Sequence, residues 1–166
     1  MLSEGEDLWI PPDSKSFVDE KYAAQFFGET PSYATTLLSR LNGNVITRES
    51  FNLLWKSYDV VVAVETDGLN FNGMCQYRNR ETNGCIVSGP TQFWSNNKTL
   101  YDETIDSDQA LIDAISAPFF PTGQRVHRES LFGLFTTTAD NKIDSAQGLS
   151  QTYSFHTDYL DITAGD

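Results

Sequence analysis

One stretch near the start of the chain limits the local backbone more than any other. Residues 8–10 (Leu-Trp-Ile) are too apolar to remain in water, and the two prolines at 11–12 force an extended approach that excludes helix. A helix can begin directly after them, because Asp13 or Ser14 can accept a backbone N–H at a helix N-terminus. The sequence therefore predicts an extended lead-in over residues 1–13, followed by a helix.

The residues after this lead-in repeat with the period of a helix. Val18, Tyr22 and Phe26 recur four positions apart and form one stripe that needs burial. Gly28 can end the helix, and Pro31 prevents it from resuming. An amphipathic helix thus precedes the first predicted strand.

Length, composition and charge limit the class of protein. A chain of 166 residues with 39% hydrophobic and 13% aromatic residues can build one core, which excludes wholesale disorder. A net charge of −12, without a Lys/Arg cluster, excludes a nucleic-acid partner and disfavours anionic lipid headgroups. We expect a single domain over residues 1–166, with a lead-in at 1–13, a core at 14–157 and a tail at 158–166.

Membrane and export signals are missing from the sequence. The most apolar run, residues 60–64, is far shorter than a membrane span and is flanked by Asp59 and Glu65. The first seven residues contain Glu4, Glu6 and Asp7 and no basic residue, whereas a signal peptide starts with basic ones. We therefore expect the chain to have been excised from a longer protein.

Two features favour an oxidising compartment. Cys75 and Cys85 flank a polar stretch that ends in the turn dipeptide Asn83-Gly84, so the loop can close into a disulfide worth about 3 kcal/mol. Two free thiols are the alternative. Asn97 begins an N-glycosylation sequon, Asn-Lys-Thr, which is used only on the luminal or extracellular side.

The middle of the chain predicts strands and helices in turn. Residues 32–40 are typical of a strand, a turn at 42–44 follows, and Thr47 is a natural N-cap for a helix over residues 48–65. The β-branched residues at the end of this helix, within 60–64, could form a strand instead. Residues 66–90 read as loop.

Two shorter helical segments are expected after this loop. Residues 90–95 predict a helical turn that places Phe93 and Trp94 against the core. Ser107 is expected to cap a helix over residues 108–116, whose apolar face contains Leu111, Ile112 and Ile115.

The last third of the chain predicts strands. Residues 130–138 predict a strand that either buries residues on both faces or has a bulge at Gly133. Residues 139–142 have the composition of a hairpin turn, and residues 145–157 alternate as a strand with Gln147 and Gln151 as interruptions. This order of elements predicts an α+β layer sandwich.

No constellation of residues predicts catalysis, a metal or a cofactor. His127 and His156 lie in different predicted strands without a nucleophile elbow. Cys75 and Cys85 lack further zinc ligands nearby. Residues 140–144 lack the spacing of a calcium loop, and a hairpin turn explains them better. We expect a protein that is not an enzyme.

The aromatic residues have two interpretations, a core or a lipid-accepting pocket. Trp55 lies on the helical stripe and favours the core. Phe119 and Phe120, held between two prolines, either pack beneath the sheet or project into a ligand passage. With Trp94, they are the candidate residues for a ligand passage or an interdomain face.

Several passages, in order, resemble the first extracytosolic segment of Patched and Niemann–Pick type C-like membrane proteins, in the resistance-nodulation-division superfamily. The matching passages are residues 8–14 with Gly28 ("LW-x-P-x-x-S … FG"), 44–49 ("N-V-L-T"), Cys75, Cys85, Ser88 and 93–94 ("C … C-x-x-S … F-W"), 120–123 ("P-x-G"), and 131–134, 140–143, 145–149 and 152–153 ("I-L-G-G … D-x-x-G-x-I-x-S-A-K-A-L-x-x-T-Y"). Two of them, residues 131–133 and 147–148, fit the pattern only loosely.

The resemblance implies both a fold and a role. It implies a ferredoxin-like two-layer sandwich with a mixed or antiparallel sheet and helices on one face, incomplete at the C-terminus. It also implies a luminal or extracellular domain of a lipid permease with a sterol-sensing domain. Such a domain binds, guides or gates a sterol or other lipid, and its partners are the membrane helices and second ectodomain of the parent chain.

Two other functions stay open from the residues alone. A free-standing secreted module that binds a ligand or a protein would share the disulfide and the sequon. A small hydrolase would need a nucleophile and a base brought together by the fold.

Overall fold

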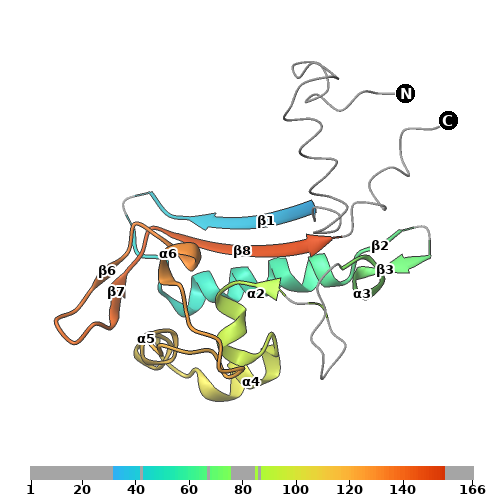
Figure 1. Cartoon of the computed structure of the whole chain (residues 1–166). Coiled ribbons are helices and arrows are strands. Elements are labelled where there is room, and N and C mark those ends of the chain that lie inside the picture. Colours follow the sequence, from blue (N-terminus) through green and yellow to red (C-terminus); the bar gives the residue numbers. More distant parts are fainter. Residues whose placement is uncertain (1–31, 42, 67, 76–84, 86, 156–166) are drawn as a thin grey trace, which may run out of the picture.

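The computed structural model describes residues 32–41, 43–66, 68–75, 85 and 87–155. Its main sheet is built on two long antiparallel strands, β1 (Ser32–Ser39) and β8 (Gly148–Phe155), which pair along their whole length (Figure 1). Two short strands, β4 (Val87–Ser88) and β5 (Phe132–Gly133), also pair antiparallel with β8. The predicted strand at residues 32–40 is thereby confirmed.

Helix α2 (Arg48–Val62) packs against one face of this sheet. Thr47 is its N-cap, as predicted, and the Thr47 side chain accepts a hydrogen bond from the backbone N–H of Ser50. The apolar stripe of α2 contributes Phe51, Leu54 and Trp55 to the core. Helices on one face of an antiparallel sheet make the domain an α+β two-layer sandwich, as the sequence predicted.

The prediction that this helix reaches residue 65 is wrong. It ends at Val62, and Glu65 belongs to the strand β2 (Glu65–Thr66), which pairs with β3 (Leu69–Asn70). The β-branched residues at the helix end lower its helix propensity, and the nearby strand offers the backbone an alternative set of hydrogen bonds. The following helix, α3 (Phe71–Met74), also lies in a region predicted as loop.

The segment after β4 is helical. The 3₁₀ helix η1 (Pro90–Trp94) buries Phe93 and Trp94, and α5 (Asp108–Ile115) is capped by the Ser107 side chain, both as predicted. Helix α4 (Lys98–Thr104), which is capped by the Asn97 side chain, was not predicted.

The single strand predicted over residues 130–138 is wrong. This stretch divides into α6 (Arg128–Leu131), β5 and β6 (Thr136–Thr137), with Leu134 in the left-handed region at φ 47°. A strand cannot continue through such a residue. The Arg128 guanidinium also fixes the segment, because it donates to the carbonyl oxygens of Ser116 at 2.7 Å and Asn141 at 2.8 Å.

The hairpin turn predicted at residues 139–142 is confirmed. It joins β6 to β7 (Ile143–Ser145), and the two strands project from the body of the domain (Figure 1). The last predicted strand begins at Gly148, three residues later than expected, because Ser145 already belongs to β7.

The inner face of β8 carries an unusual buried residue. Leu149, Gln151 and Tyr153 alternate toward the core and are all buried. Gln151 therefore belongs to the buried face and does not interrupt it. Its Oε1 accepts a hydrogen bond from Thr91 Oγ1 at 2.8 Å, and its Nε2 donates to the Tyr153 hydroxyl at 2.8 Å. These bonds satisfy a polar side chain that would otherwise be costly to bury.

The lead-in at 1–13, the helix expected to follow it, His156 and the tail at 158–166 lie outside the described residues. The described part of the main sheet has the order β1-β8-β4. The ferredoxin-like connectivity implied by the resemblance therefore stays a prediction.

Candidate functional site

Trp94, one of the three predicted passage residues, lies in the core. Its ring packs edge-on against Phe51 and Tyr101, with ring centroids 6.0 and 4.9 Å away. Its indole Nε1–H donates to Thr104 Oγ1 at 3.1 Å. Its side chain is thus buried and satisfied, which gives it a packing role in the described part of the chain.

The two phenylalanines between prolines point to different environments. Phe120 is buried, with its ring centroid 4.9 Å from that of Phe93, whereas the Phe119 side chain is 56% exposed. A short antiparallel bridge from Phe119 to Arg125 holds this loop, and the Phe120 N–H donates to the Gln124 carbonyl. Phe120 is therefore a core residue, whereas a role for the exposed Phe119 in a ligand passage or an interdomain face stays a prediction.

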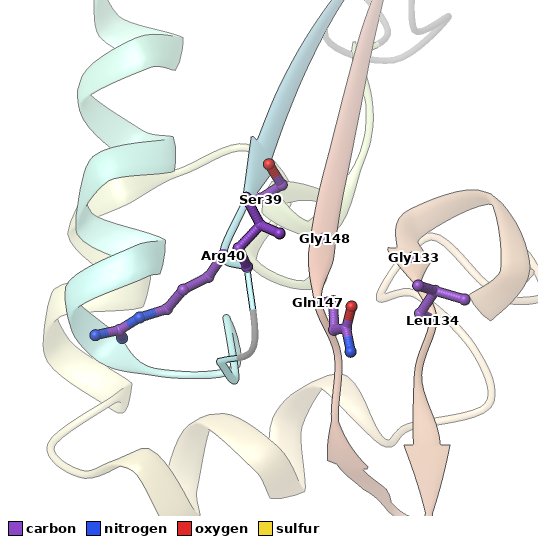
Figure 2. Close-up of a pocket in the computed structure, with 7 residues that line it drawn as sticks. Ser39, Arg40, Gly133, Leu134, Gln147 and Gly148 are labelled. Atoms are coloured by element: carbon purple, nitrogen blue, oxygen red, sulfur yellow. The ribbon is translucent and has the colours of Figure 1, made fainter.

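A shallow hollow lies at the end of the main sheet where β1, β8 and β5 meet. It has a volume of about 240 Å³, and its lining consists of Ser39, Arg40, Leu41, Gly133, Leu134, Gln147 and Gly148. Ser39 pairs with Gly148, and Gly148 pairs with Gly133, so the floor is a row of three small residues on adjacent strands. Figure 2 shows the Arg40 side chain extending away from Leu134.

Two exposed leucines stand at this hollow. The Leu134 side chain is 78% exposed and that of Leu41 is 94% exposed. Leu134 also holds a positive φ of 47°, a conformation that bulky L-residues adopt only when the surroundings impose it. Strained backbone conformations cluster at ligand-binding and active sites, which makes Leu134 a candidate contact residue.

In the described part of the chain, the sheet face that carries the hollow has no charged side chain, and Arg40, which directly follows β1, is the charged residue among those that line the hollow. Residues on this outer face alternate with the buried ones: Tyr33, Thr35, Leu37 and Ser39 on β1, Gly148, Ser150, Thr152 and Ser154 on β8, Ser88 on β4 and Gly133 on β5. In a chain of net charge −12, such a neutral face suits an apolar or neutral ligand.

Sequence reasoning missed the hollow. Gly133 and Gly148 are fifteen positions apart, and only the pairing of β5 with β8 brings them together. A Cβ at either glycine would make ordinary contacts of 3.7 Å or more, so the glycines are not required for strand pairing. Their lack of side chains leaves the space open.

The predicted disulfide is present. Cys75 and Cys85 are joined, with their Cα atoms 5.7 Å apart, and Cys75 forms an isolated bridge with Phe155 at the end of β8. The bond therefore joins Cys85 to the end of α3, and the bridge to Phe155 places Cys75 beside the main sheet. Disulfides of this kind persist in extracellular-type compartments.

Asn97, the predicted glycosylation site, is exposed at the start of α4. Its Oδ1 accepts hydrogen bonds from the backbone N–H groups of Thr99 at 3.0 Å and Leu100 at 3.3 Å. These bonds use the amide oxygen. Glycosylation would use the amide nitrogen, so capping and modification are chemically compatible.

The described residues bring together no group of His, Cys, Asp or Glu side chains that could hold a metal ion. His127 is exposed at the start of α6. Two buried polar atoms of the core lack hydrogen-bond partners within the described part of the chain, Trp55 Nε1 and the Tyr101 hydroxyl. Burial raises the pKa of Tyr101 to about 12.

Tyr101 gives the fold a predictable response to alkaline pH. Below about pH 10, Tyr101 is protonated in both states, and its ionisation does not lower the free energy of unfolding. As the pH rises from about 10 through about 12, the free energy of unfolding falls, because the unfolded chain releases the Tyr101 proton before the folded protein does. The loss is about 2–3 kcal/mol of unfolding free energy. Tyr101→Phe should remove this part of the pH dependence and stabilise the protein by about 1 kcal/mol at pH 7.

Urea denaturation between pH 7 and pH 12 measures both effects. Tyr33→Phe is the matched control, because the Tyr33 side chain is mostly exposed and should leave the alkaline loss unchanged. Equal pH dependence in wild type and Tyr101→Phe would contradict the role given to Tyr101.

Comparison with known proteins adds no identity: no protein-family description and no curated protein matches the chain. Among the described residues, no helix is long and apolar enough to cross a membrane.

Proposed function

We propose that the chain is a luminal or extracellular domain of a Patched-like permease, where it contacts a sterol or other lipid on its way to or from the membrane helices. The parent protein's membrane helices and second ectodomain are its proposed partners. The observation that carries the proposal is the apolar hollow at Gly133 and Gly148, with exposed leucines at positions 41 and 134.

The compartment supports this role. The Cys75–Cys85 disulfide and the exposed sequon at Asn97 both suit a luminal or extracellular domain. The order of motifs that resembles the Patched and Niemann–Pick type C-like segment is the reason for proposing a membrane-bound parent protein.

The surface chemistry supports a lipid ligand. Leu41 and Leu134 are both largely exposed and line the same hollow, whereas exposed apolar side chains are usually scattered singly. The floor of the hollow, formed by Ser39, Gly133 and Gly148, is free of charge. A rigid apolar body such as a sterol ring could cover both leucines and gain roughly 1.5–3 kcal/mol for each one it removes from water. The volume of about 240 Å³ admits only part of such a ligand, which fits a role in guiding rather than storing it.

Photolabelling with a diazirine sterol tests the proposal on the disulfide-bonded chain and on the membrane-bound parent. Peptides that contain Leu41 or Leu134 should be labelled, and excess unlabelled sterol should compete. Leu134→Asp should reduce the labelling roughly tenfold. Val60→Asp is the matched control, because the Val60 side chain is also aliphatic and is 70% exposed, but it lies on α2.

Two results would count against the proposal. Labelling spread evenly over the chain, or equal labelling of Leu134→Asp and Val60→Asp, would contradict the proposed lipid contact. If the full-length reading frame contains no run of about twenty apolar residues, the proposed membrane-bound parent protein is contradicted. A secreted binding module is then the favoured function.

A further inference from the structure

The edge of β1 that faces away from β8 is open in the described part of the chain. The main sheet has the order β1-β8-β4, so β1 is a margin strand eight residues long (Figure 1). Natural proteins protect such edges with charged residues, prolines or bulges. β1 has the sequence Ser-Tyr-Ala-Thr-Thr-Leu-Leu-Ser and contains none of these.

The outer face of β1 has an apolar residue on each side of a central threonine. Tyr33 is 60% exposed, Leu37 is 74% exposed, and Thr35 lies midway between them. All three point to the same face of the sheet, because alternate residues of a strand do so. The strand is therefore symmetric in character about Thr35.

This symmetry makes the strand complementary to itself. If two copies pair antiparallel about a twofold axis at Thr35, then Tyr33 of each copy faces Leu37 of the other, and the two Thr35 residues face one another. Aromatic–aliphatic and Thr–Thr pairs are both favourable across antiparallel strands. The domain already uses a Thr–Thr contact here, since Thr35 Oγ1 lies 3.2 Å from Thr152 Oγ1 on β8.

We propose that β1 is a homodimerisation edge, where two copies of this chain join their main sheets through antiparallel β1–β1 pairing centred on Thr35. The pairing satisfies the backbone groups of the open edge and partly covers the exposed side chains of Tyr33 and Leu37. No like charges meet across the axis, because β1 is uncharged. The proposal is independent of the lipid role, since the hollow lies at the Ser39 end of the sheet.

The net charge of the chain predicts how salt affects the dimer. Two copies of net charge −12 repel one another, and salt screens this repulsion. The dimer should therefore become tighter as ionic strength rises. An association driven by opposite charges would weaken instead.

Cysteine cross-linking tests the register. In the dimer, the two Thr35 Cα atoms lie about 4.5–5.5 Å apart, within disulfide reach, so Thr35→Cys should form a covalent dimer under mild oxidation. Tyr33→Cys alone should not, because its two copies lie about 13 Å apart along the strands. Mixing Tyr33→Cys with Leu37→Cys should restore cross-linking. Ser150→Cys, on the same face but on β8, is the matched control.

Sedimentation velocity on the unmodified chain tests the association itself. We expect a concentration-dependent dimer in the micromolar to millimolar range, with a dissociation constant raised roughly tenfold or more by Leu37→Lys. A monomer at every concentration and salt level would overturn the proposal. Cross-linking of Thr35→Cys no faster than Ser150→Cys, or a dimer unaffected by Leu37→Lys, would also overturn it.

Discussion

Trp94→Ala is expected to lower the free energy of unfolding by about 4 kcal/mol, a large fraction of the stability of a typical domain. Trp94 packs against Phe51 and Tyr101 in the aromatic part of the core. Its removal would leave a cavity and would also leave the Thr104 hydroxyl without its indole partner. Urea denaturation followed by circular dichroism measures the loss.

Two further variants make this result interpretable. Trp94→Phe keeps most of the volume and should cost less, so it reports on packing if the alanine variant does not fold. Phe119→Ala is the matched control, because its side chain is largely exposed and should change stability by less than about 0.5 kcal/mol. If Trp94→Ala proves no more harmful than Phe119→Ala, then Trp94 is not a core residue and its earlier interpretation as a passage residue returns.

Gly89→Ala is expected to destabilise the fold by about 3 kcal/mol, although it adds a single methyl group. A Cβ at position 89 would lie 2.7 Å from Gln151 Cγ, 2.9 Å from Gln151 Cβ and 3.0 Å from Gln151 Cα. The Gln151 side chain cannot move aside easily, because it bonds both Thr91 and Tyr153. Relief of the clash therefore means the loss of buried hydrogen bonds or a shift of β8.

Gly73→Ala provides the control for this substitution. Its Cβ would meet its nearest neighbour, Leu69 Cδ2, at an ordinary 3.5 Å, so the added methyl should be tolerated. The double variant Gly89→Ala/Gln151→Ala should lose less stability than the sum of the two single variants, because alanine at position 151 removes Cγ, the nearest clashing atom, and has no side-chain hydrogen bonds to lose when β8 shifts. Additive losses in urea denaturation would contradict the proposed contact.

These two predictions separate packing from function. Trp94 and Gly89 act on the core and on the buried face of β8, whereas the proposed lipid contact uses Leu134 on the opposite face. A variant that weakens lipid labelling without loss of stability therefore identifies a binding residue. The reverse pattern identifies a structural one.

Local signals in the sequence predicted the elements that depend on neighbouring residues. Thr47 and Ser107 were recognised as helix caps because capping involves backbone groups only two or three positions away. The disulfide and the hairpin turn at residues 139–142 are also short-range features. Local patterns failed in residues 130–138, where the long-range bonds of Arg128 and the positive φ of Leu134 replace a continuous strand.

By itself, the sequence determined the α+β class, the main helix caps, the disulfide and the acidic net charge, because each follows from composition or from residues close together in the chain. Only the tertiary structure decided that Trp94 and Phe120 are buried, that Phe119 is exposed, and that Gly133 and Gly148 meet. The physical reason is strand register: it selects which side chains face the core and which glycines become neighbours, and it is fixed by contacts between distant parts of the chain.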